Sequence, residues 1–157
     1  MISRCTLICV GKPKGWVAKG SEDYASRLRR YFHLDVIEVA EEDINRLSRQ
    51  EVLSKEGGRI AKNIPTEAYV ISLDRERGKQ YPSERIARKL EDLGVSGRSH
   101  VAIIIGGPLG LSPDIIQSSQ ELWSLGEITL PHALARVVLL EQLYRAAKIY
   151  RNEKYHW

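Results

Sequence analysis

The segment with the clearest chemical signal is HVAIIIGGPLGLSP, from His100 to Pro113. An apolar run ends in Gly106 and Gly107, and a serine–proline pair follows. A loop with so few side chains lets a ligand contact the backbone directly. A tight strand-to-helix turn that needs positive φ would use the same residues. The glycines alone leave these two interpretations equally open.

Residue type excludes the two common nucleotide-binding loops. A P-loop needs lysine and then serine or threonine after its last glycine, and here Leu111 takes the lysine position. The dinucleotide fingerprint needs G-x-G-x-x-G after the first strand, which this loop does not offer. A ligand held here would therefore be a flat or narrow molecule that contacts the backbone.

A second stretch with chemical potential is WSLGEITLPH, from Trp123 to His132. Gly126 frees the backbone, Ile128 and Leu130 can line an apolar pocket, and Thr129 offers a hydroxyl. Taken alone, the stretch favours an ordinary strand that enters a helix, with His132 at the helix cap.

Strand and helix patterns alternate along the chain. The expected strands are RCTLICVG, Leu34–Val39, Ala68–Asp74, His100–Ile105 and EITL at Glu127–Leu130. Between them we expect helices over 20–31, from Ile44 to a break or kink at Gly57-Gly58, over 83–93 with Ser83 as cap, and from Pro113 behind a Ser112 cap. The last expected helix covers 131–150. This order predicts one α/β domain over residues 1–157, with a mostly parallel sheet and flanking helices.

In such a sheet, ligands bind outside the carboxyl ends of the strands. The loops after Leu73, after Ile105 and around the fifth strand all lie there. Both stretches with chemical potential are therefore expected at one edge of the sheet.

Composition sets weaker bounds. The 157 residues carry a formal charge of +4, with basic residues concentrated near both ends, so the chain leans mildly toward anionic partners. Cys5 and Cys9 lie about 13 Å apart on one strand, too far for a disulfide. No export signal or membrane span is visible, which predicts a cytoplasmic protein. The four histidines and two cysteines lack ligand spacing, so no metal is expected.

Four segments in this order resemble one family: IIGGPLGLS after a strand, WSLGEITLPH, RVVLLEQLYRA and a terminal Tyr155-His156. The chain is similar to the SPOUT-class RNA methyltransferases. Within that class it resembles the small bacterial family that methylates N3 of a pseudouridine in large-subunit ribosomal RNA. The likeness covers nearly the whole chain and is strongest from Val101 to Tyr155.

The resemblance implies a trefoil knot in about residues 70–157 and a site for S-adenosylmethionine. It also implies a homodimer in which the partner chain completes each site, and an assembled ribosome as the substrate. The family's cofactor positions carry over to Leu73, Gly106, Gly107, Gly126, Glu127, Ile128, Thr129, Leu130 and Pro131.

The implied acceptor, N3 of a uracil-type ring, must lose a proton before it attacks a methyl group. The resemblance points to His156 as the catalytic base and to Tyr155 as a residue that stacks on or bonds to the target base. His132 is expected to fix loop geometry. Arg136, Arg145, Lys12 and Lys14 are candidate RNA contacts, although an ion pair between Glu141 and Arg145 is the favoured interpretation of that spacing. Trp157 stands where the family usually has a basic residue.

Two other functions fit parts of the sequence. A non-catalytic ribosome- or RNA-binding factor that retains the fold would bind the cofactor without turnover, or not bind it. A small-molecule nucleotide enzyme would need one of the phosphate-binding loops that residue type excludes.

Overall fold

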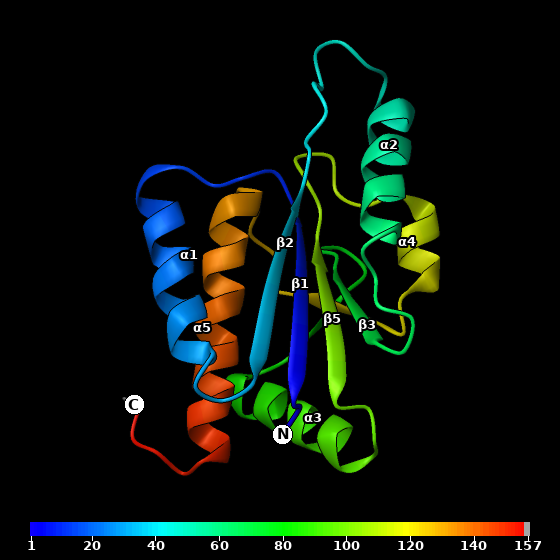
Figure 1. The fold of residues 1–157 in the computed structure, drawn as a ribbon. Coiled ribbons are helices and arrows are strands. Elements are labelled where there is room, and N and C mark those ends of the chain that lie inside the picture. The colour runs from blue at the N-terminus through cyan, green and yellow to red at the C-terminus, as the bar shows by residue number, and fades with distance from the viewer. Residues whose placement is uncertain (156–157) are drawn as a thin grey trace.

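Six strands form one sheet in the order β2-β1-β5-β3-β6-β4, and every neighbouring pair among the described residues is parallel (Figure 1). The computed structural model describes residues 1–155. The strands are β1 Arg4–Val10, β2 His33–Val39, β3 Tyr69–Leu73, β4 Lys79–Gln80, β5 His100–Ile105 and β6 Glu121–Ser124. The predicted α/β fold with a mostly parallel sheet is confirmed.

Helices cover both faces of the sheet. They are α1 Gly15–Leu28, α2 Arg49–Ala61, α3 Ser83–Val95, α4 Pro113–Ser118 and α5 His132–Tyr150. Helices α1 and α3 pack against α5 on one face, and α2 packs against α4 on the other (Figure 1). Within residues 1–155, no helix combines the length and the apolar composition that crossing a bilayer requires.

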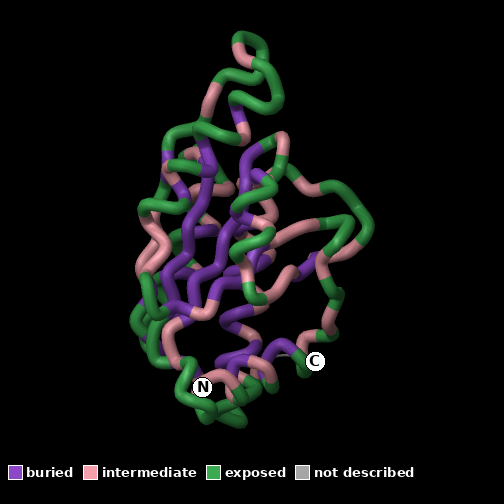
Figure 2. The backbone as a smooth tube through the Cα atoms, turned by 90° about the vertical axis from the view of Figure 1, so that its right-hand side faces the viewer, coloured by how far each residue is buried: buried purple, intermediate pink, exposed green. Residues whose placement is uncertain are grey.

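The central strand β1 is buried on both faces, as its continuous apolar sequence predicts. Cys5, Leu7 and Cys9 contribute to the core beneath α1 and α5. Ile8 and Val10 contribute to a second core on the opposite face. In Figure 2 the buried backbone runs through the middle of the molecule, between exposed loops at either end. The sheet is therefore a rigid support for the loops at its carboxyl edge.

Four predicted elements differ from the structure. EITL is not a strand: β6 lies at Glu121–Ser124, because Trp123 supplies the buried anchor and Gly126 then turns the chain out of the sheet. Helix α2 continues through Gly57 and Gly58 without the predicted break. Gly57 instead allows the helix to pack closely against Ser112, where a side chain would have no room. Pro82, and not Ser83, precedes α3 as its cap residue, and α1 begins at Gly15 instead of residue 20. The two-residue β4 has too short a pattern to be detected from sequence.

Candidate active site

A cavity of about 430 Å³ lies at the carboxyl edge of the sheet, between the loops that follow β3, β5 and β6. Seven of the residues predicted to hold the cofactor line it: Leu73, Gly106, Gly107, Gly126, Ile128, Thr129 and Leu130. Glu127 and Pro131 belong to the same loop but do not line the cavity. The structure thus brings the two glycine-containing stretches together, as their places after parallel strands predict.

The loop after β5 is shaped by backbone contacts. The Gly110 amide donates to the Gly107 carbonyl at 3.0 Å, which closes a tight turn. A Cβ atom at Gly106 would lie 2.5 Å from the Gly110 carbonyl oxygen, so residue 106 must be glycine for the turn to close. The loop consequently presents backbone to the cavity.

The loops after β3 and β6 are tied to each other. The Ser124 hydroxyl donates to the Arg75 carbonyl at 3.0 Å and lies 3.2 Å from the Gly126 amide. The Arg75 guanidinium donates to the Glu127 carbonyl at 3.1 Å. Gly126 has φ of +126°, a conformation that L side chains rarely adopt. These contacts join the loops after β3 and β6 at the edge of the cavity.

His132, the first residue of α5, lines the cavity. Its Nε2 atom lies 3.2 Å from the Glu41 carboxylate, in the segment after β2. The cap position belongs to Pro131, so the helix-cap interpretation that the stretch favoured when taken alone is wrong. The contact with Glu41 instead joins the start of α5 to the segment after β2.

Arg136 lies one turn further along α5 and is buried, with 5 % of its side chain exposed. Its guanidinium donates to the Glu38 carboxylate at 2.6 Å and to the Gly11 carbonyl at 3.0 Å. A buried guanidinium with two partners does not reach an RNA phosphate unless both contacts break. Arg136 therefore has a structural role at the start of α5, and its contact with RNA stays a prediction.

Arg145 forms the predicted helix-face ion pair with Glu141, at 2.5 Å. The Tyr155 ring packs beneath the Arg145 guanidinium, 4.7 Å from centroid to carbon, and edge-on against Tyr144. The Tyr155 hydroxyl donates to Glu141 at 3.1 Å. Burial, together with hydrogen bonds to Tyr24 and Glu141, holds the pKa of Tyr155 above its ordinary value.

Tyr155 therefore packs against the carboxyl-terminal half of α5 and does not line the cavity. Helix α5 ends at Tyr150, at the end of the sheet where the strands begin and opposite the glycine loop (Figure 1). His156, the predicted base, lies outside the described residues.

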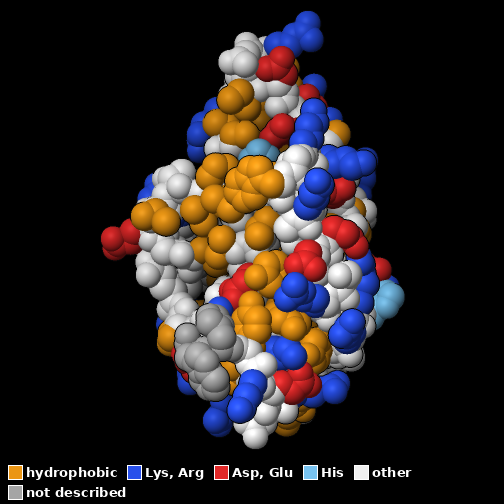
Figure 3. Space-filling model, turned by 90° about the vertical axis from the view of Figure 1, so that its left-hand side faces the viewer, with side chains coloured by type: hydrophobic (Ala, Val, Ile, Leu, Met, Phe, Trp, Pro, Cys, Tyr) orange, Lys and Arg blue, Asp and Glu red, His pale blue; other side chains and the backbone are white. Residues whose placement is uncertain are grey.

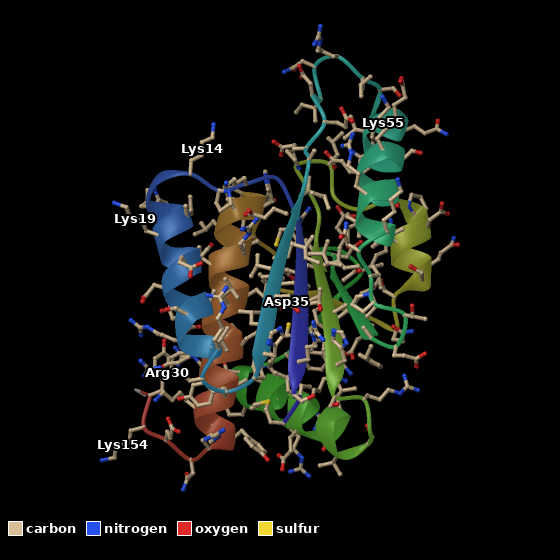
Figure 4. The ribbon with its side chains drawn as sticks, viewed as in Figure 1. Lys14, Lys19, Arg30, Asp35, Lys55 and Lys154 are labelled. Carbon is tan, nitrogen blue, oxygen red and sulfur yellow. The ribbon has the colours of Figure 1, made fainter. Side chains whose placement is uncertain are left out.

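Lys12 and Lys14 are exposed in the segment between β1 and α1. Lys14 and Lys19 point away from the body of the protein (Figure 4). Neither Lys12 nor Lys14 forms an ion pair with another residue of the described chain. Within residues 1–155, no group of three or more His, Cys, Asp or Glu side chains is placed to hold a metal ion.

Sequence reasoning missed Arg49 and Glu41. The Arg49 side chain lines the cavity and donates to the Leu109 carbonyl at 3.3 Å. Both residues come from the segment between β2 and the first turn of α2, and nothing local to their sequence indicates proximity to the glycine loop. The polar turn from Asp74 to Arg77 also lines the cavity. The sequence had placed this turn, as the loop after Leu73, at the ligand-binding edge of the sheet.

Comparison with known proteins places this fold and site in a family. A family model described as a predicted SPOUT methyltransferase matches residues 3–156. The chain belongs to the SPOUT methyltransferase family. The resemblance inferred from the glycine loop and the TLPH stretch is thereby confirmed.

The relatives of this SPOUT chain match it along its full length. A protein of Rubrobacter xylanophilus named ribosomal RNA large subunit methyltransferase H is 61 % identical over 158 residues, covering 100 % of both chains. A protein of the same name from Bifidobacterium adolescentis is 47 % identical over 159 residues, covering 98 % of this chain and 99 % of the relative.

Solved structures share the SPOUT fold at low identity. A probable methyltransferase from Bordetella pertussis superposes with a TM-score of 0.55 at 18 % identity, over 92 % of this chain and 96 % of the other. A probable methylase family protein from Haemophilus influenzae gives a TM-score of 0.54 at 16 % identity, over 98 % of this chain and 70 % of the other. These likenesses concern the fold alone.

Proposed function

We propose that this protein uses S-adenosylmethionine to methylate ring nitrogen N3 of a pseudouridine in large-subunit ribosomal RNA, on assembled ribosomes. The observation that carries the proposal is the full-length relative at 61 % identity that is named a large-subunit ribosomal RNA methyltransferase. The cavity at the carboxyl edge of the sheet supplies a site where that chemistry can occur.

The residues of the cavity fit the cofactor. Gly106 and Gly107 give backbone in place of side chains, and a Cβ atom at either position would be crowded by its neighbours. Leu73, Ile128 and Leu130 offer apolar surface to an adenine ring, and Thr129 offers a hydroxyl. When bound, the cofactor supplies a methyl group already activated on a sulfonium. The protein must then mainly align donor and acceptor.

The acceptor nitrogen needs a group that removes its proton. Tyr155 and His156 remain the proposed catalytic residues, but Tyr155 packs against α5 away from the cavity of its own chain. Helix α5 has 19 residues and therefore spans about 28 Å. It starts at the cavity with His132, and Tyr155 packs against its other half. A tail that takes part in catalysis must therefore serve the cavity of a second copy, which supports a homodimer.

The face formed by α1 and α5 suits such a dimer. Figure 3 shows hydrophobic side chains gathered on this face. Trp16 at the start of α1 is 71 % exposed, and Leu134 and Val138 on α5 are half-buried. Exposed apolar patches of this kind mark interaction sites.

The dimer is tested by Trp16→Ala, because a central aromatic side chain commonly dominates the energy of an interface. We expect the dimer dissociation constant to rise about thirtyfold in sedimentation equilibrium. Val95→Ala, which trims another exposed apolar residue on α3, is the matched control. Equal dissociation constants for the two variants would argue against this face.

Lys12, Lys14, Arg75 and Arg77 are exposed near the carboxyl edge of the sheet and supply positive charge for RNA phosphates. Each phosphate contact releases counterions, so binding must weaken as salt rises. Lys12→Ala together with Lys14→Ala is expected to reduce the salt dependence of ribosome binding and leave cofactor affinity unchanged.

The proposal includes one domain over residues 1–157 and a trefoil knot within about 70–157. It is supported by the way the loops after β3, β5 and β6 surround the point from which α5 starts. Stretching the chain from both ends in a force experiment tests the knot. A knotted chain stays shorter than its contour length when fully unfolded, and an unknotted chain reaches it.

The decisive test is methyl transfer from labelled S-adenosylmethionine to ribosomes that lack the modification, with free ribosomal RNA as the comparison. Label in large-subunit RNA from ribosomes only is the expected result, and mapping the labelled nucleotide tests the pseudouridine assignment. Measurable cofactor binding without label on either substrate would instead favour a non-catalytic ribosome-binding factor.

A further inference from the structure

Helix α2 carries a buried carboxyl group. Glu56 is 2 % exposed and faces inward, one turn after the buried Val52. Its Oε2 atom accepts a hydrogen bond from the Glu42 amide at 2.9 Å. Its Oε1 atom is buried and has no hydrogen-bond partner in the described part of the chain. An unpartnered buried oxygen is costly, so its position calls for a functional explanation.

The carboxyl group lies directly beneath the glycine loop. A Cβ atom added to Gly107 would be 3.2 Å from Glu56 Oε1 and 3.6 Å from Oε2, and 3.0 Å from Val10. On its other side, Glu56 holds the segment after β2 through the Glu42 amide. Glu56 is thus the side chain between the segment after β2 and the glycine loop, and the glycine loop lines the cavity.

The charges around Glu56 disfavour a further negative charge there. Glu41 and Glu42, from the segment after β2, are both carboxylates. Arg59 is the cation that faces the group from α2, and it already pairs with Glu42 and donates to the Ala40 carbonyl. Strand β1 and the glycine loop contribute Val10 and Gly107, which carry no charge. Burial raises the pKa of Glu56, the Glu42 amide and Arg59 oppose that shift, and the two neighbouring carboxylates add to it.

We propose that Glu56, as a neutral carboxylic acid, is a positioning residue that holds the glycine loop in the shape that binds the methyl donor. The inference rests on the proposed function, because it takes the glycine loop as the cofactor site. The side chain acts by contact with both segments: Oε2 accepts from the Glu42 amide, and Oε1 lies under Gly107 of the glycine loop. Ionisation would leave a desolvated carboxylate under the loop, with no donor for Oε1.

The test compares Glu56→Gln with Glu56→Ala by calorimetric titration of S-adenosylmethionine into the full-length protein. Glutamine has the shape of the neutral acid and keeps both an acceptor and a donor, so we expect affinity within about twofold of the original protein at pH 6. Alanine removes both contacts and should weaken binding about tenfold. For both variants, kcat on ribosomes should be unchanged when S-adenosylmethionine is saturating. Lys55→Ala, on the exposed side of the same helix (Figure 4), is the matched control and should change nothing.

The pH profile separates a neutral acid from a merely structural side chain. Because the pKa of Glu56 is raised in the folded protein, the neutral form persists at low pH and is lost as pH rises through that raised value. Cofactor affinity of the original protein should therefore fall, relative to that of Glu56→Gln, as the pH rises through the raised pKa of Glu56. Ionisation of S-adenosylmethionine itself affects both proteins equally. The difference between their affinities therefore reports the ionisation of Glu56.

Each outcome decides the inference. Unchanged affinity in Glu56→Ala, a tenfold loss in Glu56→Gln at pH 6, or parallel pH profiles would overturn it and leave the cofactor site standing. If Glu56→Ala does not fold, the glutamine variant and its pH profile still decide. If the original protein binds no S-adenosylmethionine, the proposed cofactor site falls and the inference falls with it.

Discussion

The two ends of α5 carry the same kind of ion pair in different surroundings. Near its start, Arg136 has 5 % of its side chain exposed and pairs with Glu38 on β2. Near its end, Arg145 has 23 % exposed and pairs with Glu141 one turn earlier on its own helix. The first pair connects the helix to the sheet, and the second connects the helix to itself and to the packed Tyr155.

This difference separates two kinds of support for the site. The start of α5 is anchored to the sheet edge through Arg136 and Glu38, so the cavity that His132 lines has a fixed wall. The end of α5 has an aromatic cluster in which Tyr24, Tyr31 and Tyr155 all pack against Tyr144. We infer that the first end shapes the cofactor site and that the second holds the tail ready for a partner chain.

Removal of residues 155–157 tests this division with the largest expected effect. Because Tyr155 packs away from its own cavity, the shortened protein should bind S-adenosylmethionine with unchanged affinity and lose methyl transfer to ribosomes. Calorimetry and labelled transfer measure the two quantities. Undiminished transfer would clear the tail of any role.

A mixed dimer sharpens the same test. One chain lacks residues 155–157, and the other carries Gly107→Leu, which blocks its cavity but keeps its tail. If each tail serves the other chain's cavity, one of the two sites in a mixed dimer works, so an equal mixture that pairs at random should recover about a quarter of the normal activity, although neither variant is active alone. A mixture that stays inactive would contradict the exchange of tails.

Gly107→Leu by itself should weaken cofactor binding at least about a hundredfold. A Cβ atom at this position meets Val10 at 3.0 Å and Glu56 at 3.2 Å, so the larger side chain must displace the loop toward the cavity. The control is Gly58→Ala on α2, where an added Cβ has open space. Alanine there should leave binding unchanged and raise stability by up to about 1 kcal/mol. Normal binding by Gly107→Leu would refute the cofactor site.

The sequence predicted what depends on local pattern. The buried β1, the Ser112 cap with Pro113 behind it, and α5 follow from apolar runs and helix-start signals, and the structure has them. Because parallel strands end at one edge, the glycine loop and residues 126–130 could also be placed together. Glu41, Arg49 and Glu56 could not, because their contacts join segments that no local pattern relates. The strand predicted at EITL was wrong because an apolar run beside a glycine has the pattern of a strand whether or not a neighbouring strand pairs with it.

Arg136→Ala is expected to lower the free energy of unfolding by about 2–4 kcal/mol, because it leaves the Glu38 carboxylate and the Gly11 carbonyl without their donor. Glu38 is partly exposed, which keeps the loss below that of a fully buried pair. Urea denaturation measures it. A loss below about 1 kcal/mol would mean that the pair does not anchor the helix.

Arg145→Ala should cost far less, about 0.5 kcal/mol, because its partner lies on the same helix and the pair is more exposed. Its effect should appear instead in catalysis, because Arg145 covers the Tyr155 ring and shares Glu141 with it. We expect kcat on ribosomes to fall several-fold while cofactor affinity stays constant. Arg145→Lys keeps the charge but not the flat guanidinium over the ring, so it should restore stability and not kcat. If lysine restores both, the charge of residue 145 is what matters, as in the direct contact with RNA phosphates that its sequence position suggested.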